Sequence, residues 1–328
     1  MAEPQNVGLE AEADDYENDS ALRGEGNASS TASINSNITK YREENGRTYH
    51  AYKDGKYQYP NDERENDRLN LQHHLCNLTF DGKLFTAPIP KEKRLHRVLD
   101  IGTGTGIWAI DFADEHPETK VLGVDLSPIQ PSFIPPNLIF QIDDLEEPWT
   151  FSEKFDFIYS RMMIGSVADF PRLFKQCFDN LSNGGWIETF EISFPVLLND
   201  GEFPDNSALK KWSDLFMEGC EKLGRPANSA ELYKSQLEAI GFVDVVETKY
   251  IWPSNRWPKD RKLKELGAWQ LENLISGIEA FSMAIFTRVL GWTKLEVDIF
   301  LGNVKKEMKD TRIHVYWNIF VVYGHKPE

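Results

Sequence analysis

The chain has few cysteines and no long apolar run. Its 328 residues include three cysteines, Cys76, Cys177 and Cys220, which lie far apart in the sequence. Their positions match neither the spacing of metal ligands nor the disulfide framework of a small secreted domain. We therefore expect three reduced thiols and no metal site. No run of 18 apolar residues occurs, so the sequence predicts no transmembrane helix.

Basic residues are scarce relative to acidic ones. The chain has 36 Lys and Arg against 52 Asp and Glu, which gives a net charge of −16 at pH 7. This charge repels phosphate backbones and anionic membranes, so we expect no direct binding to nucleic acid or to a membrane. The first residues are acidic where a signal peptide would be basic and then apolar, which predicts a cytoplasmic protein. The basic run at residues 91–97 keeps the nucleus as an alternative location.

The composition divides the chain into three segments. Residues 1–40 hold eight acidic residues and one aromatic residue, and they predict a disordered acidic tail, because so little apolar surface cannot offset the entropy of ordering. Residues 41–95 are rich in aromatic and charged side chains and form an N-terminal cap segment. Within it, a capping-box pattern predicts a helix over residues 62–78. Residues 96–328 form the main domain.

The main domain alternates predicted strands and helices. Short apolar runs bounded by turn residues indicate the strands, and the pattern is typical of an α/β sheet with helices on both faces. The predicted strands are residues 97–101, 121–125, 138–142, 155–160, 186–193, 242–250 and 313–323. Residues 252–310 have a mostly helical pattern and are too long for a simple connection. We expect them to form a lid or a substrate-binding insertion.

A glycine-rich sequence follows the first predicted strand. Asp100, Gly102, Gly104 and Gly106 occur in DIGTGTG, where that strand should end and a helix should begin. Small residues at such a turn allow backbone N–H groups to approach a ligand at the start of the helix. Gly104, Gly106 and Ala109 also fit the dinucleotide pattern G-x-G-x-x-A, so a nicotinamide dehydrogenase is an alternative interpretation.

Acidic residues follow the next two predicted strands. Asp125 ends the second strand, 19 residues after Gly106, where a carboxylate can accept hydrogen bonds from both hydroxyls of a ribose. Asp143 and Asp144 end the third strand, within reach of an adenine amino group, and Leu145 can pack against the ring. A helix cap or a surface position is an alternative role for Asp143 and Asp144. All of these residues lie at the carboxyl ends of strands, where open α/β sheets bind ligands.

Five motifs follow one another along the chain: VLDIGTGTGIWA, GVDLSPIQP, FQIDDLEEPW, FDFIYSRMMIGS and LSNGGWIETFE. Together they resemble the ordered motifs of class I S-adenosylmethionine-dependent methyltransferases. The segments YHAYKDGKYQYPNDERENDRL, KLKELG and VVYGHKPE are similar to the fungal LaeA-like methyltransferases, which include secondary-metabolite enzymes and velvet-associated regulators. The resemblance, from about Thr48 to Glu328, implies a Rossmann-like sheet with a helical N-terminal cap and a helical lid insertion before the last strand.

The resemblance also implies how S-adenosylmethionine is bound. The residues implied for its methionine portion are those of the glycine-rich sequence, Asp100, Gly102, Gly104 and Gly106. Asp125 would bind the ribose, and Asp144 with Leu145 would bind the adenine. Tyr57 and Tyr59, just before the N-terminal helix, would close over the cofactor.

Four further residues are candidates for substrate contacts. Arg161 follows the fourth strand near the place where cofactor and substrate should meet, although a structural ion pair is an equal alternative. Trp252, Trp257 and Tyr316 can line an apolar pocket, but at these spacings a hydrophobic core is the more common outcome. No catalytic residue is assigned, because a sulfonium methyl is already activated and a carboxylate nucleophile needs no general base.

The sequence therefore predicts an S-adenosylmethionine-dependent methyltransferase whose substrate is a small-molecule secondary metabolite. O-methylation of a carboxylate or hydroxyl is favoured over N- or C-methylation. The alternative is a regulatory methyltransferase subunit that acts with velvet-type or other methyltransferase partners in the control of secondary metabolism and development.

Overall fold

The computed structural model describes residues 40–328. The predicted acidic tail, except for Lys40, therefore lies outside the described residues. Within the described part, no helix is both long and apolar enough to cross a membrane. The three cysteines are buried free thiols.

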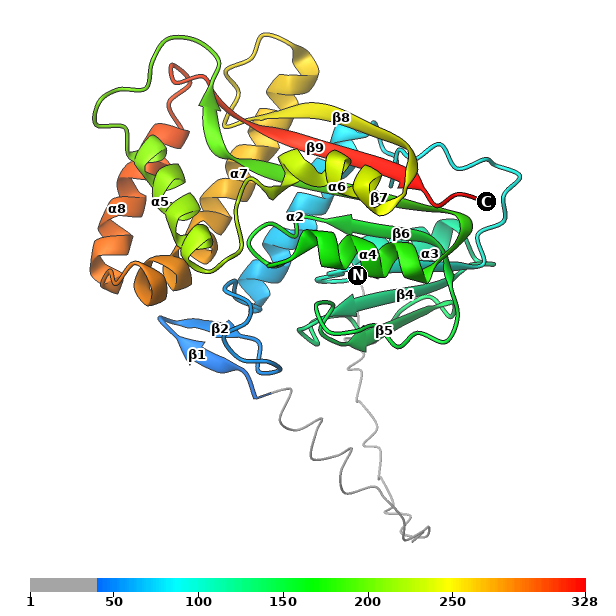
Figure 1. Cartoon of the computed structure of the whole chain (residues 1–328). Helices are drawn as coiled ribbons and strands as arrows, with labels where there is room; N and C mark the ends of the chain where they lie inside the picture. The colour runs from blue at the N-terminus through cyan, green and yellow to red at the C-terminus, as the bar shows by residue number, and fades with distance from the viewer. Residues whose placement is uncertain (1–39) are drawn as a thin grey trace, which may run out of the picture.

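One sheet of seven strands forms the centre of the fold (Figure 1). Its strand order is β5-β4-β3-β6-β7-β9-β8. The strands are β3 (Arg97–Ile101), β4 (Lys120–Asp125), β5 (Leu138–Ile142), β6 (Phe155–Arg161), β7 (Leu181–Leu198), β8 (Val243–Pro253) and β9 (Val315–His325). The first five of these strands pair in parallel, whereas β9 is antiparallel to both β7 and β8. All seven predicted strands are confirmed, and β7 and β8 extend further than predicted.

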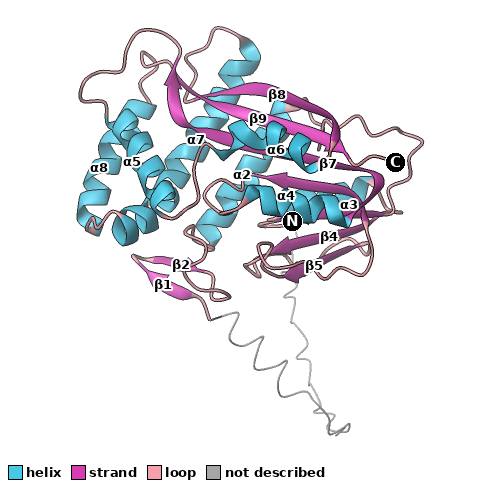
Figure 2. Ribbon diagram, in the orientation of Figure 1, coloured by secondary structure: helices cyan, strands magenta, loops and turns pink. Residues whose placement is uncertain are grey.

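Helices cover both faces of the sheet (Figure 2). They are α3 (Ile107–Glu115), α4 (Phe170–Asn180), the short 3₁₀ turn η1 (Ser229–Leu232) and α6 (Tyr233–Ile240). Trp108 of α3 is buried against Val98 on one face, and Phe174 of α4 is buried with Leu99 on the other. Val98 and Leu99 are adjacent in β3 and point to opposite faces, so both faces of the strand need apolar side chains.

The order in which the chain adds strands to the sheet reverses beside β3. β4 and β5 lie on one side of β3, and β6 lies on the other. The connections after the two neighbours β3 and β6 therefore leave in opposite directions. In sheets of this kind, such a switch point opens a crevice at the carboxyl ends of the strands, where ligands bind.

The N-terminal cap segment consists of a hairpin and a helix. β1 (Arg42–Glu44) and β2 (Arg47–Tyr49) are joined by Asn45 and Gly46, both with positive φ, as a two-residue hairpin turn requires. The helix α2 (Glu63–Thr79) confirms the predicted one. Asp62 caps it by accepting the N–H of Glu65 at 3.1 Å.

Four helical segments gather at one end of the sheet (Figure 1). They are α5 (Ala208–Lys222), α7 (Arg261–Ala284), the π-helical turn η2 (Ile285–Val289) and α8 (Lys294–Met308). We call α5, α7, η2 and α8 the end helices. They share a core with the outer parts of β7 and β9, formed by side chains such as Trp212, Val304 and Trp317. The expected insertion, residues 252–310, holds α7, η2 and α8, whereas α5 precedes it in the sequence and packs with it.

Two glycines in the end helices provide a matched test of this packing. A Cβ at Gly267 of α7 would lie 2.0 Å from the carbonyl oxygen of Asn255, whereas a Cβ at Gly302 of α8 would meet nothing within 4 Å. We expect Gly267→Ala to lower the free energy of unfolding by about 1–3 kcal/mol, as overpacking does. Gly302→Ala should raise it by up to about 1 kcal/mol, because alanine favours the helix. Urea denaturation of both variants measures the effects, and equal effects of the two substitutions would contradict the close packing of α7.

Candidate active site

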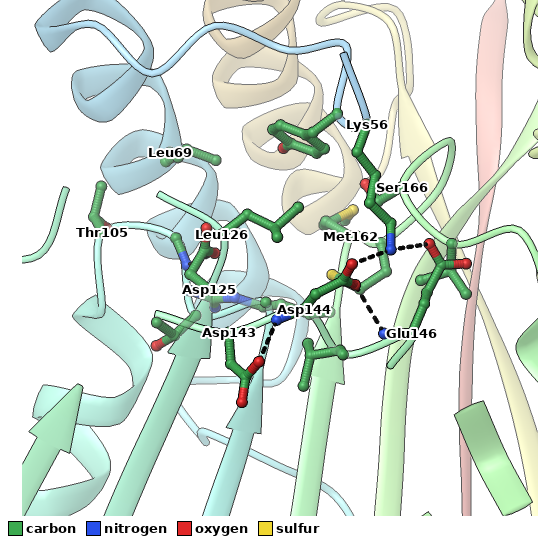
Figure 3. A pocket seen from close by; sticks show the side chains of 18 of the residues that line it. Lys56, Leu69, Thr105, Asp125, Leu126, Asp143, Asp144, Glu146, Met162 and Ser166 are labelled. Carbon is green, nitrogen blue, oxygen red and sulfur yellow. Dashed lines mark hydrogen bonds and ion pairs between the residues drawn. The ribbon is translucent and has the colours of Figure 1, made fainter. Parts of the chain in front are cut away.

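A pocket of about 870 Å³ lies at the carboxyl ends of the parallel strands, beside β3 (Figure 3). We call it the cofactor pocket, and its lining comes from the loops after β3, β4, β5 and β6, from α2 and from the segment before α2. The predicted site residues that line it are Tyr57, Gly102, Gly104, Asp125, Asp143, Asp144, Leu145 and Arg161. The structure thus brings together eight of the residues selected from the sequence.

The glycine-rich loop approaches this pocket with its backbone. Gly102 and Gly104 both have positive φ, of +66° and +57°. A Cβ at Gly102 would lie 2.2 Å from Met163 Sδ, so this glycine permits the loop to pack closely against Met163, which also lines the pocket. A Cβ at Gly104 would meet only Leu69 Cδ1, at 3.6 Å. Gly104 therefore leaves free space on the pocket side, as a ligand cradle requires.

Asp125 ties the loop after β3 to the loop after β4. Its Oδ2 accepts the N–H of Gly104 at 2.8 Å, and its Oδ1 accepts the N–H of Ser127 at 2.9 Å. Gln130 Nε2 donates to the carbonyl of Gly104 at 2.7 Å, which adds a second link between the loops. A carboxylate has about four acceptor positions, so Asp125 can still accept from a ligand hydroxyl. The carboxylate is held in place for that role before any ligand arrives.

Lys56 forms an ionic link across one side of the pocket. Its Nζ contacts Asp144 Oδ2 and lies 3.1 Å from Glu146 Oε2 (Figure 3). Glu146 is held in turn by the N–H of Ala168 at 2.7 Å and by Arg225 Nη1 at 3.2 Å. No spacing in the sequence indicates this link, because Lys56 and Asp144 are 88 residues apart.

Arg161 reaches the opposite part of the pocket and is oriented by a histidine. Its Nη2 lies 2.9 Å from His73 Nδ1, and His73 Nε2 lies 2.8 Å from Asp111 Oδ2. Arginine can only donate, so His73 Nδ1 must accept and Nε2 must carry the proton. Arg161 Nη1 is buried and has no hydrogen-bond partner among the described residues. The side chain therefore presents an unused donor beside the pocket.

Burial changes the ionisation of the carboxyl groups near this pocket. It raises the pKa of Asp100 to about 7, although Thr103 Oγ1 donates to Asp100 Oδ2 at 2.5 Å. Burial also raises the pKa of Asp125, against the effect of the two backbone N–H groups that it accepts. A cation bound beside these groups would favour their ionised forms.

A second cavity, of about 590 Å³, adjoins the cofactor pocket. We call it the substrate cavity. The two share Tyr57, Leu69 and Met162 as lining residues. The other lining residues are mostly apolar or aromatic and come from the cap segment, β7, the loop after β6 and the end helices: Tyr59, Arg68, Gln72, Ile164, Ile192, Phe194, Trp212, Phe216, Gln270, Asn273, Leu274 and Phe281.

Three predicted cofactor residues do not line the cofactor pocket. Tyr59 lies in the substrate cavity, where its hydroxyl donates to the carbonyl of Ile164 at 3.3 Å. Asp100 is buried beneath the loop and supports Thr103. Gly106 is the N-cap residue of α3, and a Cβ there would lie 2.3 Å from Phe140 Cζ, so this glycine permits close packing.

The three aromatic substrate candidates line neither the cofactor pocket nor the substrate cavity. Trp252 is fully buried in the core, where its Nε1 donates to Thr79 Oγ1 at 2.8 Å. Trp257 stacks on His314, and its Nε1 donates to a backbone carbonyl in β9. Tyr316 pairs with Pro253 within the sheet. The bulky side chains that form the substrate cavity come instead from the cap segment, β7, α5 and α7.

A Rossmann-like sheet of this strand order, with a glycine-rich pocket at its switch point, defines a class I methyltransferase fold. The sequence matches the family model described as a methyltransferase domain over residues 71–247.

Curated relatives cover most of the chain. It is 40% identical over 300 residues to methyltransferase pytC of Aspergillus terreus, and the aligned region covers 91% of this chain and 92% of that protein. It is 39% identical over 293 residues to the probable methyltransferase tdiE of Emericella nidulans, covering 88% and 90%. It is 40% identical over 290 residues to the secondary metabolism regulator LAE1 of Cochliobolus heterostrophus, covering 87% and 94%.

The chain therefore belongs to the methyltransferase domain family and, within it, to the fungal LaeA-like proteins. It is an S-adenosylmethionine-dependent methyltransferase, and the dehydrogenase interpretation of the glycine-rich loop is wrong.

Gly104→Ala tests whether the loop holds the cofactor. The added methyl group has room in the ligand-free protein but would occupy the space of a ligand. We expect the affinity for S-adenosylmethionine to fall at least tenfold in isothermal titration. The free energy of unfolding should also fall by about 1–2 kcal/mol, because alanine disfavours the left-handed backbone conformation of this position.

Gly82→Ala is the matched control. Gly82 also has a positive φ, of +85°, and a Cβ there would meet nothing within 4 Å. This variant should lose similar stability and keep the cofactor affinity of the unchanged protein. Equal cofactor affinities for the two variants would show that the loop is not the cradle.

Proposed function

We propose that this enzyme transfers the methyl group of S-adenosylmethionine to an oxygen atom of a small, largely apolar secondary metabolite. The observation that carries this proposal is the junction of the two cavities at Tyr57, Leu69 and Met162. A methyl donor in the cofactor pocket and an acceptor in the substrate cavity would meet there. Such a junction holds both reactants in one orientation, which supplies much of the rate enhancement in a displacement reaction.

The residues of the cofactor pocket fit S-adenosylmethionine in this arrangement. Asp125 binds the ribose hydroxyls with the acceptor positions that the loop leaves open, and Asp144 with Leu145 binds the adenine. The loop at Gly102 and Gly104 receives the methionine portion. We assign its carboxylate to Arg161, because Nη1 of this side chain is the buried donor without a partner beside the pocket.

The protein needs to supply little chemistry beyond binding. Bound S-adenosylmethionine provides a methyl group that its sulfonium already activates. The titratable residues that line the substrate cavity are Tyr57, Tyr59 and Arg68, and burial raises the pKa of both tyrosines well above 10. None of these side chains is a general base near neutral pH. A carboxylate or an acidic hydroxyl, which reacts without such a base, is therefore the favoured methyl acceptor.

A regulatory role is the second candidate, because the relatives include regulators at the same level of identity as enzymes. LAE1 is a secondary metabolism regulator, whereas pytC is a methyltransferase, and each is 40% identical to this chain. In this case the chain would act with a velvet-type or other methyltransferase partner in the cytoplasm or nucleus. The largely apolar substrate cavity beside the cofactor pocket favours the first candidate.

Incubation with radiolabelled S-adenosylmethionine and whole-cell extract tests the proposal. We expect label in the small-molecule fraction, in compounds that lose it under ester or ether cleavage. At a concentration of S-adenosylmethionine below saturation, Gly104→Ala should give at most about a tenth of that label. Label found in protein alone, or a stable protein partner in pull-down without any small-molecule product, would contradict the proposal and support the regulatory candidate.

A further inference from the structure

The substrate cavity contains a buried hydrogen-bond donor that the described residues leave unpaired. Gln270 of α7 is 0% exposed and lines this cavity, but it does not line the cofactor pocket. Its Nε2 has no hydrogen-bond partner among the described residues. An unpaired buried N–H group is unfavourable, because it has lost its contacts with water. The Gln270 side chain therefore suits a ligand with a hydrogen-bond acceptor.

The neighbouring side chains determine which end of the Gln270 amide is free. Arg68 can only donate, and its Nη1 donates to Asn273 Oδ1 at 2.8 Å. Asn273 must therefore turn its Nδ2 towards Gln270, where it donates to Oε1 at 3.0 Å. If the Gln270 amide were reversed, two NH₂ groups would face each other. The free end is thus the donor Nε2.

The wall beside Gln270 carries balanced charge. Arg68 Nε and Nη2 donate to Glu65 Oε1 at 2.9 and 2.7 Å, and both side chains are buried. Leu274 and Phe281 complete this part of the wall with apolar surface. A charged ligand group here would lose its hydration without a free counter-charge, whereas a neutral acceptor loses less. The wall therefore favours a neutral oxygen.

We propose that Gln270 Nε2 donates a hydrogen bond to a neutral carbonyl oxygen of the substrate, which is a small carbonyl-bearing apolar ring compound. Gln270 is a substrate-binding residue with no part in the methyl transfer itself, since it lines the substrate cavity and does not line the cofactor pocket. The methyl-accepting atom must reach the junction of the two cavities, so it is a different atom from the carbonyl oxygen that Gln270 binds. The role in methyl transfer rests on the proposed function, but the recognition of the carbonyl group does not.

A pair of probes that differ in one oxygen atom tests this contact. 1-Tetralone and tetralin share a fused ring frame, and only 1-tetralone has a carbonyl group. We would measure the dissociation constants of both from the full-length protein by ligand-observed NMR, with S-adenosylhomocysteine present. In Gln270→Met, the dissociation constant of 1-tetralone should rise at least tenfold relative to that of tetralin. The affinity for tetralin itself should change little. Comparing ratios removes any general loosening of the cavity.

Leu274→Met is the matched control, because Leu274 lines the same wall of α7 and has no polar group. It should change both affinities together and keep the ratio of the unchanged protein. If Gln270→Met does not fold, Gln270→Leu is used in its place, because leucine also removes the donor and adds no charge to the wall. The ratio should shift in the same direction.

The outcomes separate this inference from the proposed function. An unchanged ratio in the Gln270 variant, or no binding of either probe to the unchanged protein, overturns the inference whatever the labelling experiment shows. A shifted ratio together with no small-molecule methylation would support the carbonyl site and contradict the proposed function.

Discussion

Arg68, which a buried ion pair with Glu65 holds in place on α2, joins the cap segment to α7 at the wall of the substrate cavity. Both side chains are only 4% exposed, and Arg68 reaches from α2 to Asn273 of α7 and lies 4.8 Å from the ring centroid of Phe281. Gly277 leaves the necessary space, because a Cβ there would lie 2.4 Å from Arg68 Cδ. Loss of one partner would leave an unpaired buried charge, at a cost of about 3–5 kcal/mol. The position of α7, and with it the polar wall of the cavity, depends on this pair.

The two cavities draw their walls from different parts of the fold. The cofactor pocket is built mainly from the strand ends of the sheet, where parallel strands place their loops side by side. The substrate cavity is built mainly from the cap segment and the end helices, which belong to no part of the parallel sheet. Only Tyr57, Leu69 and Met162 belong to both. Changes in the end helices can therefore alter the substrate while the cofactor pocket is kept, which fits a family whose members have different roles.

Sequence patterns and the family resemblance predicted the sheet and eight of the nineteen residues that line the cofactor pocket. Strands such as β3 and β6 are short apolar runs, and the glycine-rich loop is a continuous motif, so both can be recognised locally. The capping box expected at Asp62 is formed only in part, because the Glu65 carboxylate turns away from the helix start to pair with Arg68. The Asn-Gly pair at Asn45 and Gly46 is a recognisable signal for the two-residue turn of the hairpin. Apolar periodicity does not detect a helix such as α2, whose buried face includes charged side chains.

The sequence by itself predicted the strands that carry the cofactor pocket, because strands follow from local patterns of backbone preference and apolar spacing. Its class of protein and its cofactor came from the resemblance of its ordered motifs to class I methyltransferases. Only the tertiary structure decided that Lys56 pairs with Asp144, that Trp252 belongs to the core, and that Gln270 keeps a free donor. Each of these depends on side chains that meet across 88 or more residues of sequence, as Lys56 with Asp144 and Arg68 with Asn273 do. Such contacts follow from the packing of whole elements, and no local pattern encodes which polar groups that packing will pair and which it will leave for a ligand.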